Sequence, residues 1–170
     1  MVGFLTAIDH FPAAVEAVLL HEGGFSNDSA DRGGATNMGI SSVHHPDVDV
    51  RALDRAKAID LYRNRYWLRY RLNEIEDVRI ATKALDLCVW MGPDDAARYL
   101  QKAINAAAGE ARVVVDGVIG SKTLAALQEV DPNSVVVVLR ALALEHVRRQ
   151  VERNPDQERF RRGWERRALQ

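Results

Sequence analysis

The sequence predicts a mainly α-helical, single-domain protein in which one long loop follows the first helix. The 170 residues are enough for one compact domain with its own core. Along most of the chain, apolar residues recur at steps of three or four, which is the period of an amphipathic helix. Residues 25–52 lack this period and contain Asn, Asp, Ser, Gly and Pro, so we expect an ordered loop there, with at most a short β element.

Each predicted helix has a start or a stop signal. The first carries apolar residues between Phe4 and Leu19 and ends at Gly23-Gly24, because glycine commonly follows a last helical turn. Asp54 and Asp77 are typical caps for the starts of the second and third helices. Pro93 and the two acids after it suit the first turn of a fourth. The helices after the first are expected at 54–68, 77–91, 93–107, 121–129 and 131–154, followed by a last basic helix with Phe160 and Trp164.

Composition excludes several classes of protein. No apolar run approaches the ~20 residues of a membrane-spanning helix, so no stable membrane insertion is expected. Cys88 is the one cysteine, which excludes an internal disulfide and a multi-cysteine zinc site. No basic leader precedes the first apolar stretch, so we expect synthesis in the cytoplasm without a signal peptide. A net charge of −1 argues against a dedicated nucleic-acid binder, although residues 139–170 hold nine Arg against five acids.

The residues that best suggest chemistry lie around the end of the first helix. Glu22 continues the apolar face of that helix and sits at the negative end of its dipole. This position and partial burial both raise the pKa of a carboxyl group, as a general acid requires. Asp31 can face back across a cleft, and Thr36 offers a hydroxyl to hold a water. On spacing alone, a solvated Glu22 and a turn-forming Asp31 would be the more ordinary interpretation.

Several motifs extend this pattern along the chain. They are Glu-Gly-Gly-Phe at 22–25, Gly-Gly-Ala-Thr-Asn-Met-Gly-Ile at 33–40, Tyr-Arg-Asn-Arg-Tyr-Trp at 62–67, Leu-Asp at 85–86, Asp-Gly-Val-Ile-Gly at 116–120 and Gly-Trp at 163–164. In this order they resemble glycoside hydrolase family 108, the short N-acetylmuramidases of phage endolysins and bacterial secretion activators. Met38 and Trp90 depart from the family pattern, where an aromatic residue and Asn are usual.

The resemblance implies a lysozyme-like fold with two halves. Residues 1–92 would be catalytic, and 93–170 resemble the family's predicted peptidoglycan-binding region. The family's catalytic Glu falls on Glu22. The spacing of Glu22, Asp31 and Thr36 is also similar to the catalytic trio of phage lysozymes, which favours an inverting reaction.

Further residues are expected around the sugar-binding cleft. The candidates are Asn37, Gly39, Trp67, Tyr70, Asp86 and Trp90. Tyr62 and Tyr66 lie at helical spacing and are expected mainly to pack in the core. For Asp86, a buried structural hydrogen bond is an equal alternative. The last basic helix is expected to be a solvated face around buried Phe160 and Trp164, with attraction to an anionic cell wall as its functional alternative.

The sequence and the resemblance together predict a peptidoglycan hydrolase. It would cleave the β-1,4 bond between N-acetylmuramic acid and N-acetylglucosamine in glycan strands, as a monomer without metal, cofactor or nucleic-acid partner. It would act at the cell wall or in the periplasm, after delivery by a holin or a secretion system. The alternatives are a lytic transglycosylase and a non-catalytic wall-binding secretion helper.

Overall fold

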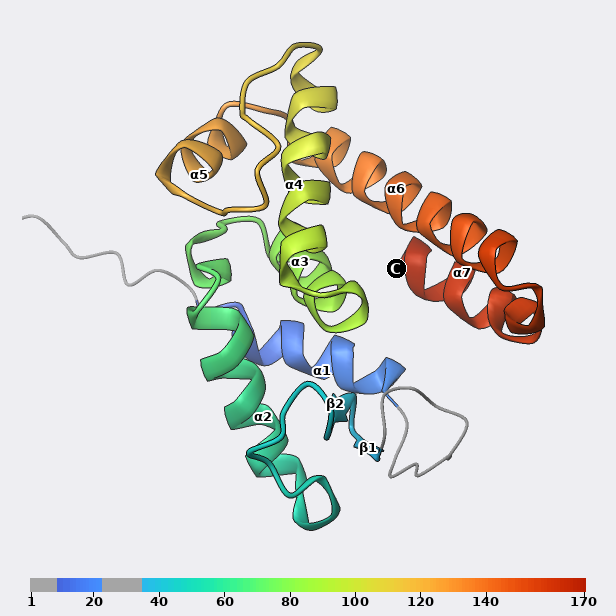
Figure 1. Ribbon diagram of the computed structural model, residues 1–170. Coiled ribbons are helices and arrows are strands. Elements are labelled where there is room, and N and C mark those ends of the chain that lie inside the picture. The colour runs from blue at the N-terminus through green and yellow to red at the C-terminus, as the bar shows by residue number, and fades with distance from the viewer. Residues whose placement is uncertain (1–8, 23–34) are drawn as a thin grey trace, which may run out of the picture.

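Helices dominate the described part of the molecule (Figure 1). The computed structural model describes residues 9–22 and 35–170. Over these residues the α-helices are α1 (Phe11–His21), α2 (Arg55–Tyr62), α3 (Val78–Met91), α4 (Pro93–Ala108), α5 (Ser121–Gln128), α6 (Pro132–Arg153) and α7 (Arg161–Leu169). Two short antiparallel strands, β1 (Thr36–Asn37) and β2 (Ile40–Ser41), form a hairpin. The predicted mainly α, lysozyme-like architecture with a short β element is confirmed.

The helix starts follow the signals in the sequence. The carboxylates of Asp54, Asp77 and Asp131 accept hydrogen bonds from backbone N–H groups in the first turns of α2, α3 and α6. Pro93 occupies the first turn of α4, as its fixed φ favours. These signals predict boundaries well because each one acts within a single helical turn.

The second predicted helix changes type midway. The chain is α-helical over Arg55–Tyr62 and then forms a wider π-helix over Arg63–Leu68. Apolar periodicity predicts that the segment is helical but does not detect a local widening of the turn. Segments of π-helix are rare and frequently lie at functional sites.

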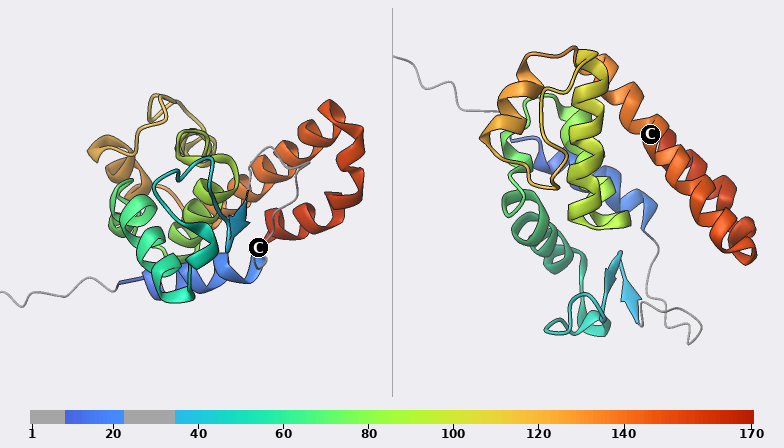
Figure 2. Two further views of the ribbon diagram at one scale, coloured as in Figure 1. Left: turned by 60° about the horizontal axis from the view of Figure 1, so that its bottom comes forward. Right: turned by 45° about the horizontal axis from the view of Figure 1, so that its top comes forward.

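The helices pack around α3. Helices α1 and α4 lie against it, and α6 packs along α4 (Figure 1). Helix α7 runs back beside α6, so that its C-terminal end approaches the end of α1 (Figure 2). One cluster of buried apolar residues contains members from both halves of the chain, including Leu85 of α3 and Leu139 of α6. None of the helices in the described part is long and apolar enough to cross a membrane.

The basic C-terminal segment departs from its prediction. A 3₁₀-helix over Pro155–Phe160 precedes α7, and Phe160 lies at the very start of α7, where it is exposed. Its ring contacts Trp164, with the centroids 5.6 Å apart. Ala168, near the other end of α7, is the residue of this helix that is fully buried. The expectation that Phe160 is buried was therefore wrong, because it lies at the junction between the 3₁₀-helix and α7, and Trp164 is half-buried.

Helix α6 gives a direct test of this packing. Leu139 is fully buried, and Leu139→Ala should lower the free energy of unfolding by about 2–5 kcal/mol, because apolar contacts are lost and a cavity remains. The exposed Val137 on the same helix is the control, and Val137→Ala should change stability by less than about 0.5 kcal/mol. Urea denaturation followed by circular dichroism measures both. Equal losses in the two variants would contradict the described packing of α6.

Candidate active site

Glu22 lies just after the last turn of α1, where the backbone leaves the helix with ψ of 128°. Val18, one turn earlier, is fully buried, and the side chain of Glu22 is 15% exposed. The carboxylate therefore lies at the edge of the core, as the periodicity indicated. A glutamate so little exposed needs a charged or hydrogen-bonding partner.

The partner is Arg167 of α7, which also bonds a second carboxylate. Its Nη2 donates to Glu22 Oε1 at 2.7 Å, and its Nε donates to Asp86 Oδ1 at 2.8 Å. Lys83 donates from Nζ to Asp86 Oδ2 at 3.2 Å and to the Arg167 carbonyl oxygen at 2.7 Å. The four side chains are between 4% and 15% exposed. Two nearly buried carboxylates are thus matched by two cations in one network.

This network bears on two expectations from the sequence. For Asp86, sugar binding and a buried structural hydrogen bond were equal alternatives, and the structure agrees with the second, since both of its oxygens are bonded to cations inside the protein. Arg167 was assigned to a solvated basic face, whereas its guanidinium is nearly buried. No local pattern could reveal this contact, because 145 residues separate Arg167 from Glu22.

The hairpin turn forms a second wall beside Glu22. Met38 and Gly39 connect β1 to β2 with positive φ values of 47° and 74°, as in a type I′ turn. A Cβ atom on Gly39 would lie 2.6 Å from the Glu22 carboxyl carbon and 2.5 Å from Tyr62 Oη. Burial raises the pKa of Tyr62, and its hydroxyl donates to the Met38 carbonyl oxygen at 2.7 Å. Position 39 therefore requires glycine for both its backbone angle and its space.

Two other candidates from the sequence have structural positions. The Asn37 amide is buried and donates from Nδ2 to the carbonyl oxygens of Val50 and Leu53, at 2.9 and 3.2 Å, which ties the hairpin to the following segment. Trp67 is 1% exposed, and its ring centroid lies 5.6 Å from that of Phe11 in the core. Helical spacing marks such residues as apolar-facing but does not say which face meets a ligand. In the described part of the chain, both side chains are engaged in contacts within the protein.

The two remaining catalytic candidates are placed differently. Thr36 lies half-buried on β1, in register with Ser41 of β2. Asp31 lies outside the described residues.

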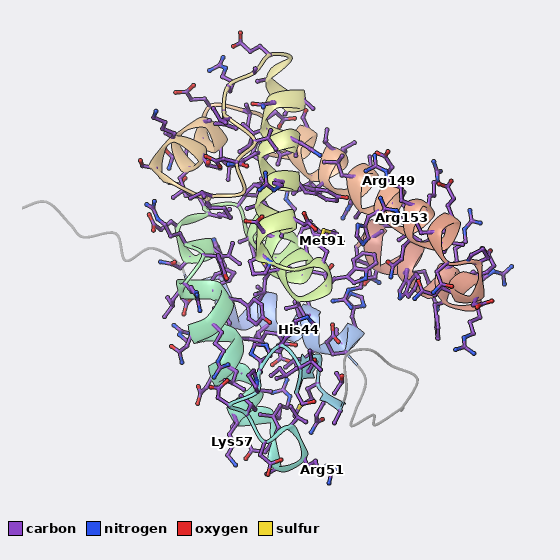
Figure 3. All side chains as sticks on the ribbon, viewed as in Figure 1. His44, Arg51, Lys57, Met91, Arg149 and Arg153 are labelled. Carbon is purple, nitrogen blue, oxygen red and sulfur yellow. The ribbon has the colours of Figure 1, made fainter. Side chains whose placement is uncertain are left out.

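A pocket of about 470 Å³ borders Gly39. Its lining comes from the segments 39–45, 65–70 and 88–93, and includes Tyr70 and Trp90, two of the residues expected around the cleft. His44 and Met91, labelled in Figure 3, belong to the first and third of these segments. Gly39 touches the Glu22 carboxylate and also lines the pocket, so the pocket opens beside the candidate acid.

Trp90 links this pocket to the charge network. The Arg167 guanidinium carbon lies 5.3 Å from the centroid of the Trp90 ring, within the range of a cation–π contact. The Trp90 ring also meets His146 of α6, with the centroids 5.8 Å apart. Within the described ranges, no group of His, Cys, Asp and Glu is arranged to hold a metal ion.

Removing Arg167 tests the network. Arg167→Met keeps much of the side-chain volume but leaves two nearly buried carboxylates with Lys83 alone, so it should lower the free energy of unfolding by about 3–5 kcal/mol. The neighbouring Arg166 is exposed, and Arg166→Met should have little effect. Urea denaturation compares the two variants. A stability for Arg167→Met close to that of Arg166→Met would show that the network does not form.

Gly39 gives an independent test of the turn. Gly39→Ala forces a side chain into a positive φ and against Glu22, so it should destabilise the protein by about 1–3 kcal/mol. Gly163 lies in α7 with open space around it, so Gly163→Ala should stabilise the protein by about 0.5–1 kcal/mol. Thermal unfolding measures both changes. If Gly39→Ala were also stabilising, the described contact between the turn and Glu22 would be incorrect.

Comparison with known proteins agrees with this geometry. The family model described as Glycosyl hydrolase 108 matches residues 15–92, and the model described as Predicted Peptidoglycan domain matches residues 95–169. The solved structure of Brucella abortus SagA is similar over 93% of this chain and 88% of that chain, with 31% sequence identity and a TM-score of 0.74. No curated protein matches the chain. The two family matches in this order, and a relative that covers nearly the whole fold, show that the chain belongs to glycosyl hydrolase family 108.

Proposed function

We propose that this protein hydrolyses the β-1,4 bond between N-acetylmuramic acid and N-acetylglucosamine in peptidoglycan, with Glu22 as the general acid. The observation that carries the proposal is the placement of Glu22, a nearly buried carboxylate held by Arg167 and packed against Gly39, which lines a pocket. The family match over 15–92 supports glycoside hydrolysis. The match over 95–169 supports peptidoglycan as the polymer.

In the proposed reaction, Glu22 donates its proton to the glycosidic oxygen as the bond from that oxygen to the sugar carbon breaks. Asp31, with Thr36, would position a water and stabilise the positive charge that develops on the sugar.

If the water attacks from the opposite face, the anomeric carbon inverts, which requires carboxyl groups about 6.5–9.5 Å apart. A retaining nucleophile requires about 5–5.5 Å. We propose inversion, and the anomer of the first product, observed by NMR, decides between the two.

The ion pair with Arg167 sets a condition on this reaction. A general acid must enter the reaction protonated, and Glu22 Oε1, one of the two atoms that can carry that proton, accepts from Arg167 in this structure. Arg167 is also bonded to Asp86 through a different nitrogen, so it can release Glu22 without leaving its site. We propose that Arg167 orients Glu22 in the resting enzyme and gives up this one contact when a sugar enters.

Glu22→Gln tests the assignment of the acid. The amide keeps the size of the side chain and can still accept from Arg167, but it has no acidic proton, so lysis should fall by about 100- to 10,000-fold with the fold intact. Loss of turbidity of permeabilised Gram-negative cells measures activity, and circular dichroism checks folding. Glu16 lies on the same helix with an exposed side chain, so Glu16→Gln is the control. Undiminished lysis by Glu22→Gln would eliminate Glu22 as the acid.

The products released from purified cell wall also distinguish the muramidase from the two alternative functions. A lytic transglycosylase would leave anhydro sugar ends, which mass spectrometry finds lighter by one water than hydrolysed ends. A non-catalytic secretion helper would bind purified sacculi without releasing reducing ends. We further propose that the protein works as a monomer at the cell wall or in the periplasm, delivered there by a holin or a secretion system.

A further inference from the structure

The pocket beside Glu22 contains a chain of polar contacts that the proposed reaction does not use. Arg65 holds Asp47 through both terminal nitrogens, and its Nη1 lies 3.0 Å from Asp47 Oδ1. The same Nη1 lies 2.9 Å from His45 Nδ1, and His45 Nε2 lies 3.0 Å from Tyr66 Oη. His45 is only 8% exposed. These contacts thus connect the surface carboxylate of Asp47 to the hydroxyl of Tyr66 in the pocket wall.

The chemistry of these groups determines which atom donates and which accepts in each of these hydrogen bonds. A guanidinium only donates, so His45 Nδ1 must accept from Arg65. A neutral imidazole carries one N–H, which must then be on Nε2 and must be donated to Tyr66 Oη. Burial and the nearby Arg65 lower the pKa of His45, and the charge of Asp47 opposes them only in part. The lowered pKa keeps the ring neutral near pH 7.

The hydroxyl proton of Tyr66 is therefore free to be donated elsewhere. Burial raises the pKa of Tyr66, so the group remains a hydroxyl. In the described part of the chain, its oxygen makes no other hydrogen bond. Tyr66 lines the same pocket as Gly39, which touches Glu22. A donor whose orientation is set by His45 thus lies in the wall of the pocket that Gly39 borders.

Other free groups in the pocket wall narrow the chemistry of its ligand. Arg69 is exposed and has no ion-pair partner among residues 9–22 and 35–170; its guanidinium carbon lies 5.8 Å from the centroid of the Tyr70 ring. Two groups of the lining, Arg69 and Tyr66, whose oxygen already accepts from His45, are thus placed to donate to a ligand. A ligand group that only accepts, such as a carbonyl oxygen, matches them better than a group that must also donate. The aromatic faces of Tyr70 and Trp90 add apolar surface in the same lining.

We infer that Tyr66 is a substrate-positioning residue that donates a hydrogen bond to the carbonyl oxygen of an N-acetyl group on the glycan strand, and that His45, fixed by Arg65, orients this hydroxyl. The inference rests on the proposed function and adds a determinant of specificity to it. Because the donor is oriented before substrate binds, little rotational freedom is lost when the hydrogen bond forms. It assigns a ligand-binding role to a tyrosine whose spacing in the sequence indicated core packing.

Tyr66→Phe removes only the hydroxyl. It should raise KM for purified sacculi about 3- to 10-fold with a smaller change in kcat, as expected for the loss of one hydrogen bond. Binding is then measured in the inactive Glu22→Gln protein, with intact sacculi and chemically de-N-acetylated sacculi as probes. The preference for acetylated sacculi should shrink by the same 3- to 10-fold in the Glu22→Gln, Tyr66→Phe double variant. A merely structural tyrosine would weaken binding to both probes equally.

A matched pair at His45 tests the orienting role. His45→Gln supplies an N–H for Tyr66 and a carbonyl oxygen for Arg65, so it should keep most of the wild-type preference for acetylated sacculi. His45→Leu supplies neither group, so it should reduce the preference for acetylated sacculi as much as Tyr66→Phe does. Combining His45→Leu with Tyr66→Phe should reduce this preference little further, because both changes remove the same contact. Thermal unfolding confirms that each variant folds.

The outcomes distinguish this inference from the proposed function. An unchanged preference for acetylated sacculi in the Tyr66→Phe protein, with Glu22→Gln inactive, would overturn the role of Tyr66 and leave the muramidase proposal standing. Equal behaviour of His45→Gln and His45→Leu would overturn the orienting role of His45. Full lysis by the Glu22→Gln protein would instead overturn the choice of acid, whatever the Tyr66 variants do.

Discussion

Arg167 forms hydrogen bonds to two nearly buried carboxylates, whose negative charges would otherwise be balanced only by Lys83. Glu22 follows α1 and Asp86 lies on α3, and one guanidinium from α7 reaches both. Breaking a buried ion pair by removing one partner is costly, because the remaining charge has lost its water and its counter-ion. The position of Glu22 therefore depends on the docking of the last helix, and the C-terminal half of the chain contributes directly to the candidate active site.

The other side of Glu22 is constrained by close packing. The hairpin turn approaches the carboxylate so tightly that only glycine fits at position 39, and the Tyr62 hydroxyl holds the same turn through the Met38 carbonyl oxygen. Met38 is a non-glycine residue with a positive φ, a conformation that is uncommon and persists where surrounding contacts enforce it. The ion pair on one side and the turn on the other leave the carboxyl group little freedom. Such rigidity is what a positioned proton donor needs.

The features that the sequence predicted correctly are local ones. Helix starts at Asp54, Asp77 and Asp131 depend on residues within one turn, and the partial burial of Glu22 follows from its spacing after Val18. The features that it missed depend on contacts between distant segments. Periodicity marked Trp67 as apolar but could not place it against Phe11 rather than in the cleft. The candidate Asp31 stays a prediction.

The same limit applies to the polar residues of the site. Asn37 is an ordinary polar residue in a loop until the chain folds and brings the Val50 and Leu53 carbonyl groups to its amide. The His45 ring has a fixed tautomer only because Arg65, 20 residues later, donates to it. Neither spacing nor composition contains this information. The family resemblance pointed to Glu22 but carried no information on its ion pair with Arg167 or on the contact between His45 and Tyr66.

The separation between Glu22 and Arg167 also has a consequence for synthesis. A ribosome completes the first helix long before it adds the arginine 145 positions later. Throughout that interval the nascent chain has Lys83, once it is made, as the one cation of the four-membered cluster. The candidate acid thus reaches its final setting only after translation of the last helix. Growing fragments on the ribosome would lack this ion pair until the arginine of α7 had been added and the helix had docked beside Glu22.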